Sequence, residues 1–297
     1  MSKLITVFGA TGNQGGSVIK HILADSTLSK TFKIRGITRD ASKAAAQALA
    51  KQGADLSDKA SVTEALRGSD TVFLVTNYWE SAKYDVEFGQ GKNVADASKE
   101  LGVQHLIFST LLHVGKVTNG RLAHVPHFEA KADIEEYIKK IGVPASFYLP
   151  GYFMSNFKQS VQKGQDGSLS FAFPVSKDAK FPLIDIAEDT GKFVKGILKN
   201  REATLNKHIL GAENYYTPEQ IRSGLESATG KKTHYAQISA EQYMSFLPEY
   251  MAEEMLENHQ FIDNPGYYNG ADLKESHDVV EDKLVSWEEF VKKSGAF

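Results

Sequence analysis

A glycine-rich turn near the N-terminus constrains the fold of this chain more than any other sequence feature. Gly9, Gly12 and Gly15 have G-x-x-G-x-x-G spacing, directly after an apolar segment, Lys3–Phe8, that predicts a strand. Apolar residues at helical spacing follow, and a second strand predicted at Phe32–Thr38 completes a βαβ unit. Glycines in such a turn let the backbone approach a pyrophosphate at the helix N-terminus, so the unit predicts nucleotide binding. A turn that needs glycine only for its backbone conformation is the alternative.

Strands and helices alternate through the first half of the chain. Further strands are predicted at 71–76, 106–109 and 145–149, and helices at 85–101 and 128–141. Gly142 and Pro144 form a stop signal after the last of these helices. The alternation predicts an α/β fold with a doubly wound parallel sheet, which binds ligands at the carboxyl ends of its strands. We assign residues 1–150 to this nucleotide-binding domain.

The pattern changes after Pro150. Turn residues separate short strands, and two clear helices are predicted at Pro218–Thr229 and at 240–258. Residues 151–297 are therefore predicted to form a second, smaller, mixed α/β domain, some segments of which return to the first sheet.

Composition disfavours several classes of function. The chain has 34 Lys and Arg against 37 Asp and Glu, a net charge of -3, which disfavours direct binding to nucleic acid. The absence of cysteine excludes disulfides, thiolate metal sites and cysteine nucleophiles, and we predict no metal site. No apolar run approaches the roughly 18 residues of a membrane span, and the N-terminus is unlike a cleavable signal. We therefore expect no membrane association and a cytoplasmic or nuclear location.

The residues after the second strand bear on the choice of cofactor. Enzymes that use NAD usually place a carboxylate here, whereas this chain places Arg39 first, with Lys43 four residues later. Arg39 can form a bidentate contact with a 2′-phosphate and Lys43 can add a second charge, so the pattern favours NADP(H). In the alternative interpretation, Asp40 is a helix N-cap and the two basic residues are solvated.

A further motif lies where short-chain dehydrogenases carry their catalytic residues. Those enzymes transfer protons with a Tyr-x-x-x-Lys pair, which this sequence lacks. At the corresponding place stand His127 and Lys131. Lys131 can still bind a nicotinamide ribose, and His127 is a candidate acid, with a surface or packing residue as the alternative.

Polar and aromatic residues follow two of the predicted strands. Thr76, Asn77, Tyr78 and Trp79 follow one strand, and the segment 150–156 leaves another at the same edge, where a cofactor should lie. An aromatic lid on the core is the alternative interpretation of the first group.

Four short sequence segments resemble the NmrA-like family, whose members are atypical short-chain dehydrogenases/reductases, and the resemblance is closest to its NADPH-sensor type. They are residues 7–16, 75–81, 120–123 and 127–131. The resemblance covers most of the chain, and in the last 100 residues it is mainly one of pattern.

The resemblance implies an extended Rossmann-type NADP(H)-binding domain, a smaller α/β domain, and a regulatory role in redox sensing and transcription rather than a clearly catalytic one. It also implies a protein partner, such as a transcription factor or a signalling protein, and leaves a homodimer open. By matching position, the cofactor-binding residues would be Gly9, Ala10, Thr11, Gly12, Asn13, Gln14, Gly15, Arg39, Lys43, Asp55, Leu56, Thr76, Asn77, Tyr78, Lys92, Lys131, Tyr152, Phe153 and Asn156.

One departure from the family concerns the third strand. Between Ala54 and Asp55 the family usually has about five more residues, which form a strand that runs toward the adenine. We therefore expect this strand to be missing, with the sheet edge beside the second strand shortened or rebuilt, and the position of Asp55 at the adenine is then open.

The sequence leaves two functions open. The absence of Tyr-x-x-x-Lys favours a redox-sensing regulator that acts through protein partners. An aromatic-rich cleft between two domains favours the alternative, an NADPH-dependent reductase of quinone-like or aldehyde-like small molecules.

Overall fold

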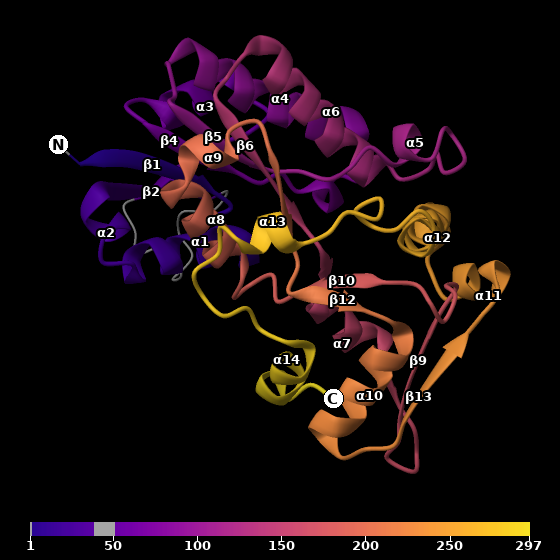
Figure 1. Ribbon diagram of the computed structural model, residues 1–297. Coiled ribbons are helices and arrows are strands. Elements are labelled where there is room, and N and C mark those ends of the chain that lie inside the picture. Colours follow the sequence, from indigo (N-terminus) through magenta and orange to yellow (C-terminus); the bar gives the residue numbers. More distant parts are fainter. Residues whose placement is uncertain (1, 39–50) are drawn as a thin grey trace.

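The computed structural model describes residues 2–38 and 51–297, with only the backbone described for residues 51–53. A seven-stranded sheet forms one end of the molecule, at the upper left of Figure 1. Its order is β11-β6-β5-β4-β1-β2-β3, and every neighbouring pair is parallel. The strands are β1 (Lys3–Phe8), β2 (Phe32–Thr38), β3 (Lys51–Gly53), β4 (Thr71–Leu74), β5 (His105–Ser109), β6 (Ala145–Pro150) and β11 (His208–Gly211). The predicted doubly wound parallel sheet is confirmed.

The sheet is covered on both faces. One layer holds α1 (Asn13–Ala24) and α8 (Thr190–Lys199), with the short helices α2 (Leu28–Thr31) and α9 (Arg201–Thr204) nearby. The other holds α3 (Lys59–Leu66), α4 (Tyr84–Glu100) and α6 (Pro126–Ile141), with α5 (Val114–Val117) before α6. Alternate residues of β5 serve the two layers, because Ile107 packs with α1 and α8 while Leu106 and Phe108 pack with α4 and α6.

Local signals set the ends of several helices. Gly142 follows α6 in the left-handed conformation with φ 71°, as the stop signal predicts. Capping boxes begin α10 (Pro218–Thr229), α11 (Ala240–Ser245) and α14 (Trp287–Ser294), and α10 has the bounds that the sequence predicts.

The third strand is present, which corrects the expectation that it is missing. Residues 51–53 form β3, and they pair with 36–38 of β2 at the edge of the sheet. The strand has only three residues, which fits the alternative expectation of a shortened sheet edge.

The second half forms the other end of the molecule, at the lower right of Figure 1. It has two three-stranded sheets, β12-β10-β7 and β13-β9-β8. The strands are β7 (Tyr152–Phe153), β8 (Gln162–Lys163), β9 (Leu169–Phe173), β10 (Phe181–Ile184), β12 (Asn214–Tyr216) and β13 (Thr233–Gln237), and the remaining helices are α7 (Phe157–Ser160), α12 (Glu249–Asp263) and α13 (Lys274–His277). Its apolar core joins the α4 and α6 side of the main sheet in one cluster, and α8 and β11 return to that sheet.

The single helix predicted at 240–258 is wrong. The segment forms α11 and α12, separated at Pro248, whose extended backbone (ψ 137°) begins the second helix. A proline inside a helix removes one hydrogen bond and clashes with the preceding turn, so the chain restarts there. The break leaves α12 as a separate helix that packs beside the start of α6.

None of the helices in the described ranges combines the length and the apolar character that are needed to cross a membrane.

Candidate functional site

The turn after β1 has the geometry that its glycines suggest. Gly9 has a positive φ of 65°, and the amide of Gly12 donates to the carbonyl oxygen of Gly9 at 2.8 Å. A Cβ added at Gly15 would lie 2.4 Å from that same oxygen, so α1 can begin this close to the turn only with glycine there. The tight spacing brings the first turn of α1 to the carboxyl edge of the sheet.

The N-terminus of α1 lacks a side-chain cap, in contrast to the capped starts of α10, α11 and α14. Its N-cap is Gly12, which offers no side-chain oxygen, and the first turn has no acidic residue. Among the described residues no side chain caps its first amides, and the positive end of the helix dipole lies at the carboxyl edge of β1 and β4. Such an end binds anionic groups such as phosphates. Thr11 and Gln14 tie the turn to neighbouring strands, through Thr38 Oγ1 at 3.2 Å and Ser109 Oγ at 2.8 Å.

The segment after β4 lines the same edge. Thr76 is buried, and its Oγ1 has no hydrogen-bond partner within the described part of the chain. Asn77 precedes the short 3₁₀ turn η2 (Tyr78–Glu80), in which Tyr78 is buried and Trp79 remains 45% exposed. A buried hydroxyl without a hydrogen-bond partner among the described residues could bind a polar group of a ligand at this edge.

His127 lies in the first turn of α6 and is bonded to the second half of the molecule. Its Nδ1 is 2.5 Å from Glu254 Oε1 on α12, and its backbone amide donates to the same oxygen at 3.2 Å. The ring lies near those of Trp79 and Tyr78, with centroids 5.1 and 5.9 Å away. Burial lowers the pKa of His127, and the Glu254 carboxylate opposes that shift. The imidazole is therefore a buried group whose Nδ1 side is occupied by a carboxylate.

Lys131 lies one turn further along α6 and is also paired. Its Nζ binds Glu87 Oε1 of α4, and the side chains of Lys131 and Glu87 are only 13% and 1% exposed. The second Glu87 oxygen is buried without a hydrogen-bond partner in the described ranges. An ammonium group has three donors, so Lys131 can hold Glu87 and still donate to a ribose hydroxyl.

Three of the remaining predicted cofactor residues lie near the edge. Asp55 and Leu56 follow β3, where Asp55 accepts a hydrogen bond from the amide of Ser57 at 2.8 Å. Phe153 packs against the apolar cluster of β1 and α1.

Other predicted residues make their contacts elsewhere. Lys92 lies midway along α4, where it binds Asp96 at 2.7 Å and covers the ring of Tyr137. Tyr152 points into the core of the second half, 3.4 Å from His259 Nε2, and Asn156 is exposed nearby. Burial raises the pKa of the Tyr152 hydroxyl well above its ordinary value. Arg39 and Lys43 lie outside the described residues.

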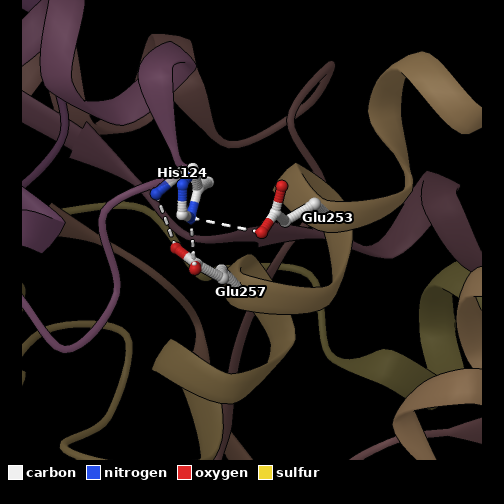
Figure 2. Close-up of side chains that lie close together, drawn as sticks. All are labelled: His124, Glu253 and Glu257. Atoms are coloured by element: carbon white, nitrogen blue, oxygen red, sulfur yellow. Dashed lines mark hydrogen bonds and ion pairs between the residues drawn. The ribbon is translucent and has the colours of Figure 1, made fainter.

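A second contact joins the segment before α6 to α12 (Figure 2). His124 Nδ1 is 2.8 Å from Glu257 Oε1 and 3.4 Å from Glu253 Oε1, and its amide donates to Glu257 at 2.6 Å. One imidazole nitrogen of His124 and one carboxylate oxygen each of Glu253 and Glu257 lie within 4.8 Å of one another. His124 and Glu253 are mostly exposed, and Glu257 is paired twice with His124. These contacts lie on α12 one helical turn after Glu254, so they form a second attachment of that helix to the segment before α6.

Sequence reasoning identified His127 and Lys131 but missed their partners. Glu254 is 127 residues from His127, and Glu87 is 44 residues from Lys131. Glu87 is an acidic residue on a predicted helix beside buried positions, which is a weak signal. Nothing in the sequence pattern singles out Glu254 from Glu253 and Glu257 around it.

The chain is similar in sequence and in fold to known proteins. A model of the NmrA-like family matches residues 1–291. The NmrA-like family domain-containing oxidoreductase malD of Malbranchea aurantiaca is 34% identical over 261 residues, which cover 80% of this chain and 76% of the relative. The crystal structure of NmrA, a negative transcriptional regulator, in complex with NADP has a TM-score of 0.81 at 19% identity and covers 98% of this chain and 95% of its own. The triphenylmethane reductase of Citrobacter sp., complexed with NADP(H), has a TM-score of 0.78 at 20% identity over 99% and 100% of the two chains.

Proposed function

The chain belongs to the NmrA-like family, and on that premise we propose that it is an NADP(H)-dependent reductase of quinone-like or aldehyde-like small molecules. The observation that carries the proposal is the buried His127–Glu254 pair, one turn before Lys131. A histidine held by a carboxylate is a common proton-transfer unit, and here it takes the position of the missing tyrosine. Support also comes from a relative at 34% identity that is named an oxidoreductase.

The dinucleotide would lie along the carboxyl edge of the sheet. The uncapped start of α1 suits the pyrophosphate, and the unpartnered Thr76 hydroxyl suits a polar group further along the edge. Lys131 would donate to the ribose of the nicotinamide half. The bound cofactor supplies a hydride, and the protein residues supply orientation and the proton.

His127 would deliver that proton from Nε2. With NADPH bound, the imidazolium would give its Nε2 proton to the substrate oxygen that gains negative charge when the hydride is transferred, which would leave a hydroxyl group on the product, NADP⁺ and a neutral imidazole. Solvent then reprotonates the ring. Trp79, which is half exposed beside His127, offers an aromatic surface to a planar substrate.

A substitution at His127 tests the proposed activity. We expect NADPH oxidation with quinones or aldehydes to fall about 100-fold to 10,000-fold in His127→Gln, because general acid catalysis is typically worth that factor. The NADPH affinity should stay unchanged, because His127 does not hold the cofactor. His124→Gln is the matched control, since it removes a nearby histidine that also contacts α12. A rate in His127→Gln within a few-fold of wild type would contradict the proposal.

The choice of NADP(H) over NAD(H) is part of the proposal and depends on Arg39 and Lys43. Two charge-assisted contacts with a 2′-phosphate should favour NADP(H) by roughly 2 to 4 kcal/mol. Calorimetry with both cofactors measures this preference directly. Arg39→Ala should lose much of it, and equal affinities in wild type would remove the phosphate assignment.

A redox-sensing regulator is the second candidate, and one observation favours it. His127 binds α12, and aromatic side chains are exposed at Tyr250 in the first turn of that helix and at Phe246 just after α11, which are 75% and 70% exposed. A cofactor that displaces Lys131 or His127 would therefore act on a surface that a protein partner can recognise. Hydrogen exchange of residues 240–263 should then differ between the NADPH and NADP⁺ complexes. Equal exchange in the two complexes would contradict this role.

A further inference from the structure

We infer that Glu254 is a positioning residue that completes the reductase site from outside the nucleotide-binding sheet, by orienting the His127 ring and holding its Nδ1 proton so that Nε2 exchanges the proton with the substrate. This inference rests on the proposed function. It makes α12 a structural part of the catalytic site, although Glu254 touches neither substrate nor cofactor.

The geometry around one carboxylate oxygen carries the inference. Glu254 Oε1 accepts from the His127 backbone amide at 3.2 Å and lies 2.5 Å from His127 Nδ1. Two donors of one residue on one acceptor fix both the place of the residue and the plane of its ring. Because the carboxylate can only accept from Nδ1, the neutral ring carries its proton on Nδ1 and leaves the Nε2 lone pair uncovered.

The other groups around the pair agree with this assignment. The Tyr78 hydroxyl of η2 lies 3.5 Å from Glu254 Oε2, and burial together with Glu254 raises the pKa of that hydroxyl to about 12. Tyr78 is therefore a donor to Glu254 and cannot compete for the Nδ1 proton. Lys131 of α6 and Glu87 of α4 bring opposite charges that bind each other. Burial and Lys131 lower the pKa of His127, and Glu254 and Glu87 raise it.

The neighbouring turn of α12 offers a matched control. Glu257 also crosses between the two halves and binds a histidine, His124, through both its ring and its amide. Glu257 makes no contact with His127 among the described residues. Glu257→Gln therefore perturbs a contact of the same kind between α12 and the first half, and it leaves the carboxylate at the His127 ring in place.

The test combines a spectroscopic readout with a rate. Nitrogen-15 NMR of the imidazole rings, assigned by the resonance lost in His127→Gln, reports the tautomer and titration of His127 in the protein without substrate. We expect the Nδ1–H tautomer in wild type. In Glu254→Gln the amide oxygen can still accept from Nδ1, but the negative charge is lost, so His127 should titrate about one pH unit lower.

The rate should follow the titration. If the imidazolium is the proton donor, NADPH oxidation falls as the pH rises through the pKa of His127. In Glu254→Gln this fall should move to lower pH, and the rate at pH 7 should drop about 10-fold with NADPH affinity unchanged. Glu257→Gln should leave the tautomer, the titration and the pH profile as in wild type.

Failure of the inference and failure of the proposed function are distinguishable. If wild type reduces no quinone or aldehyde, the reductase proposal fails, and the NMR titration still decides whether Glu254 positions His127. If wild type is active and needs His127, but Glu254→Gln and Glu257→Gln behave alike in titration and pH profile, the inference alone is overturned. An Nε2–H tautomer in wild type would also overturn it.

Discussion

The glycines of the turn after β1 leave different amounts of room for a side chain. A Cβ at Gly15 would lie 2.4 Å from Gly9 O, one at Gly12 would lie 3.3 Å from the same oxygen, and one at Gly16 would lie 3.6 Å from Ala10 O. Gly15 is therefore required by the fold. Gly12 has an ordinary backbone conformation with φ -92°, so its importance lies in what must approach it.

Gly12→Val should abolish dinucleotide binding and leave the fold largely intact. The branched side chain would occupy the space in which the backbone approaches the pyrophosphate, and we expect affinity to fall at least about 100-fold, or about 3 kcal/mol. Calorimetry measures the affinity and circular dichroism the fold. Gly16→Ala is the control and should bind normally, whereas Gly15→Ala should unfold at a lower temperature. A folded Gly12→Val protein with normal NADPH affinity would show that the turn has another purpose.

At the scale of elements, α4 and α6 are joined by a buried ion pair as well as by apolar packing. Glu87 and Lys131 are largely removed from water, so each depends on the other to offset the loss of hydration. By contrast, the pair of Lys116 on α5 and Glu136 on α6 has exposed side chains. Removal of the lysine should therefore lower the free energy of unfolding more at the buried pair than at the exposed pair.

Lys131→Met should lower the free energy of unfolding by about 3 kcal/mol, because it leaves the Glu87 carboxylate buried and alone. Adding Glu87→Leu should restore most of that stability. NADPH affinity should remain low in both the single and the double variant, since the proposed ribose donor is absent from each. Urea unfolding and calorimetry separate the two effects. Lys116→Met should change stability by less than about 1 kcal/mol, and an equal loss in both lysine variants would contradict the difference.

At the scale of the whole molecule, each half buries a neutral histidine. His105 lies at the start of β5, and His259 lies on α12 between Tyr152 and Tyr243. Burial lowers the pKa of each imidazole to about 4, and the positive charge of Arg201 contributes at His105. In the unfolded chain both rings regain the ordinary value near 6.5. Between these pH values the two imidazoles bind protons in the unfolded state and remain neutral in the folded state.

The free energy of unfolding should therefore keep the full contribution of these two histidines above about pH 6.5, and it should decline as the pH falls toward 4. For His259 a depression of this size corresponds to about 3 kcal/mol. His259→Gln should reduce the decline by about that amount, because glutamine does not titrate and can still bond to the two tyrosines. Urea unfolding at several pH values measures the difference. His234→Gln, at an exposed position of β13, should leave the decline unchanged, and an unchanged decline in His259→Gln would refute this origin.

The parallel, doubly wound class of the sheet, the turn after β1 and the ends of several helices follow from the sequence alone. Each depends on chemistry within a few residues: glycine at a positive φ, the alternation of apolar positions, or a proline beside a cap. The pattern does not reveal the third strand, because three residues are too few to show a period. Apolar periodicity alone predicts one helix over 240–258, whereas the structure has α11 and α12 because Pro248 interrupts the backbone hydrogen bonds.

The sequence by itself thus determined a doubly wound dinucleotide fold and the positions of His127 and Lys131 on one helix. Only the tertiary structure decided which carboxylates they meet. Glu254 and Glu87 are 127 and 44 residues away from them, and their approach depends on how α12 and α4 pack beside α6. Local backbone preferences do not encode such distances. Long-range contacts arise from burial of apolar faces across the whole chain, and that burial also sets the charge and protonation of the groups it brings together.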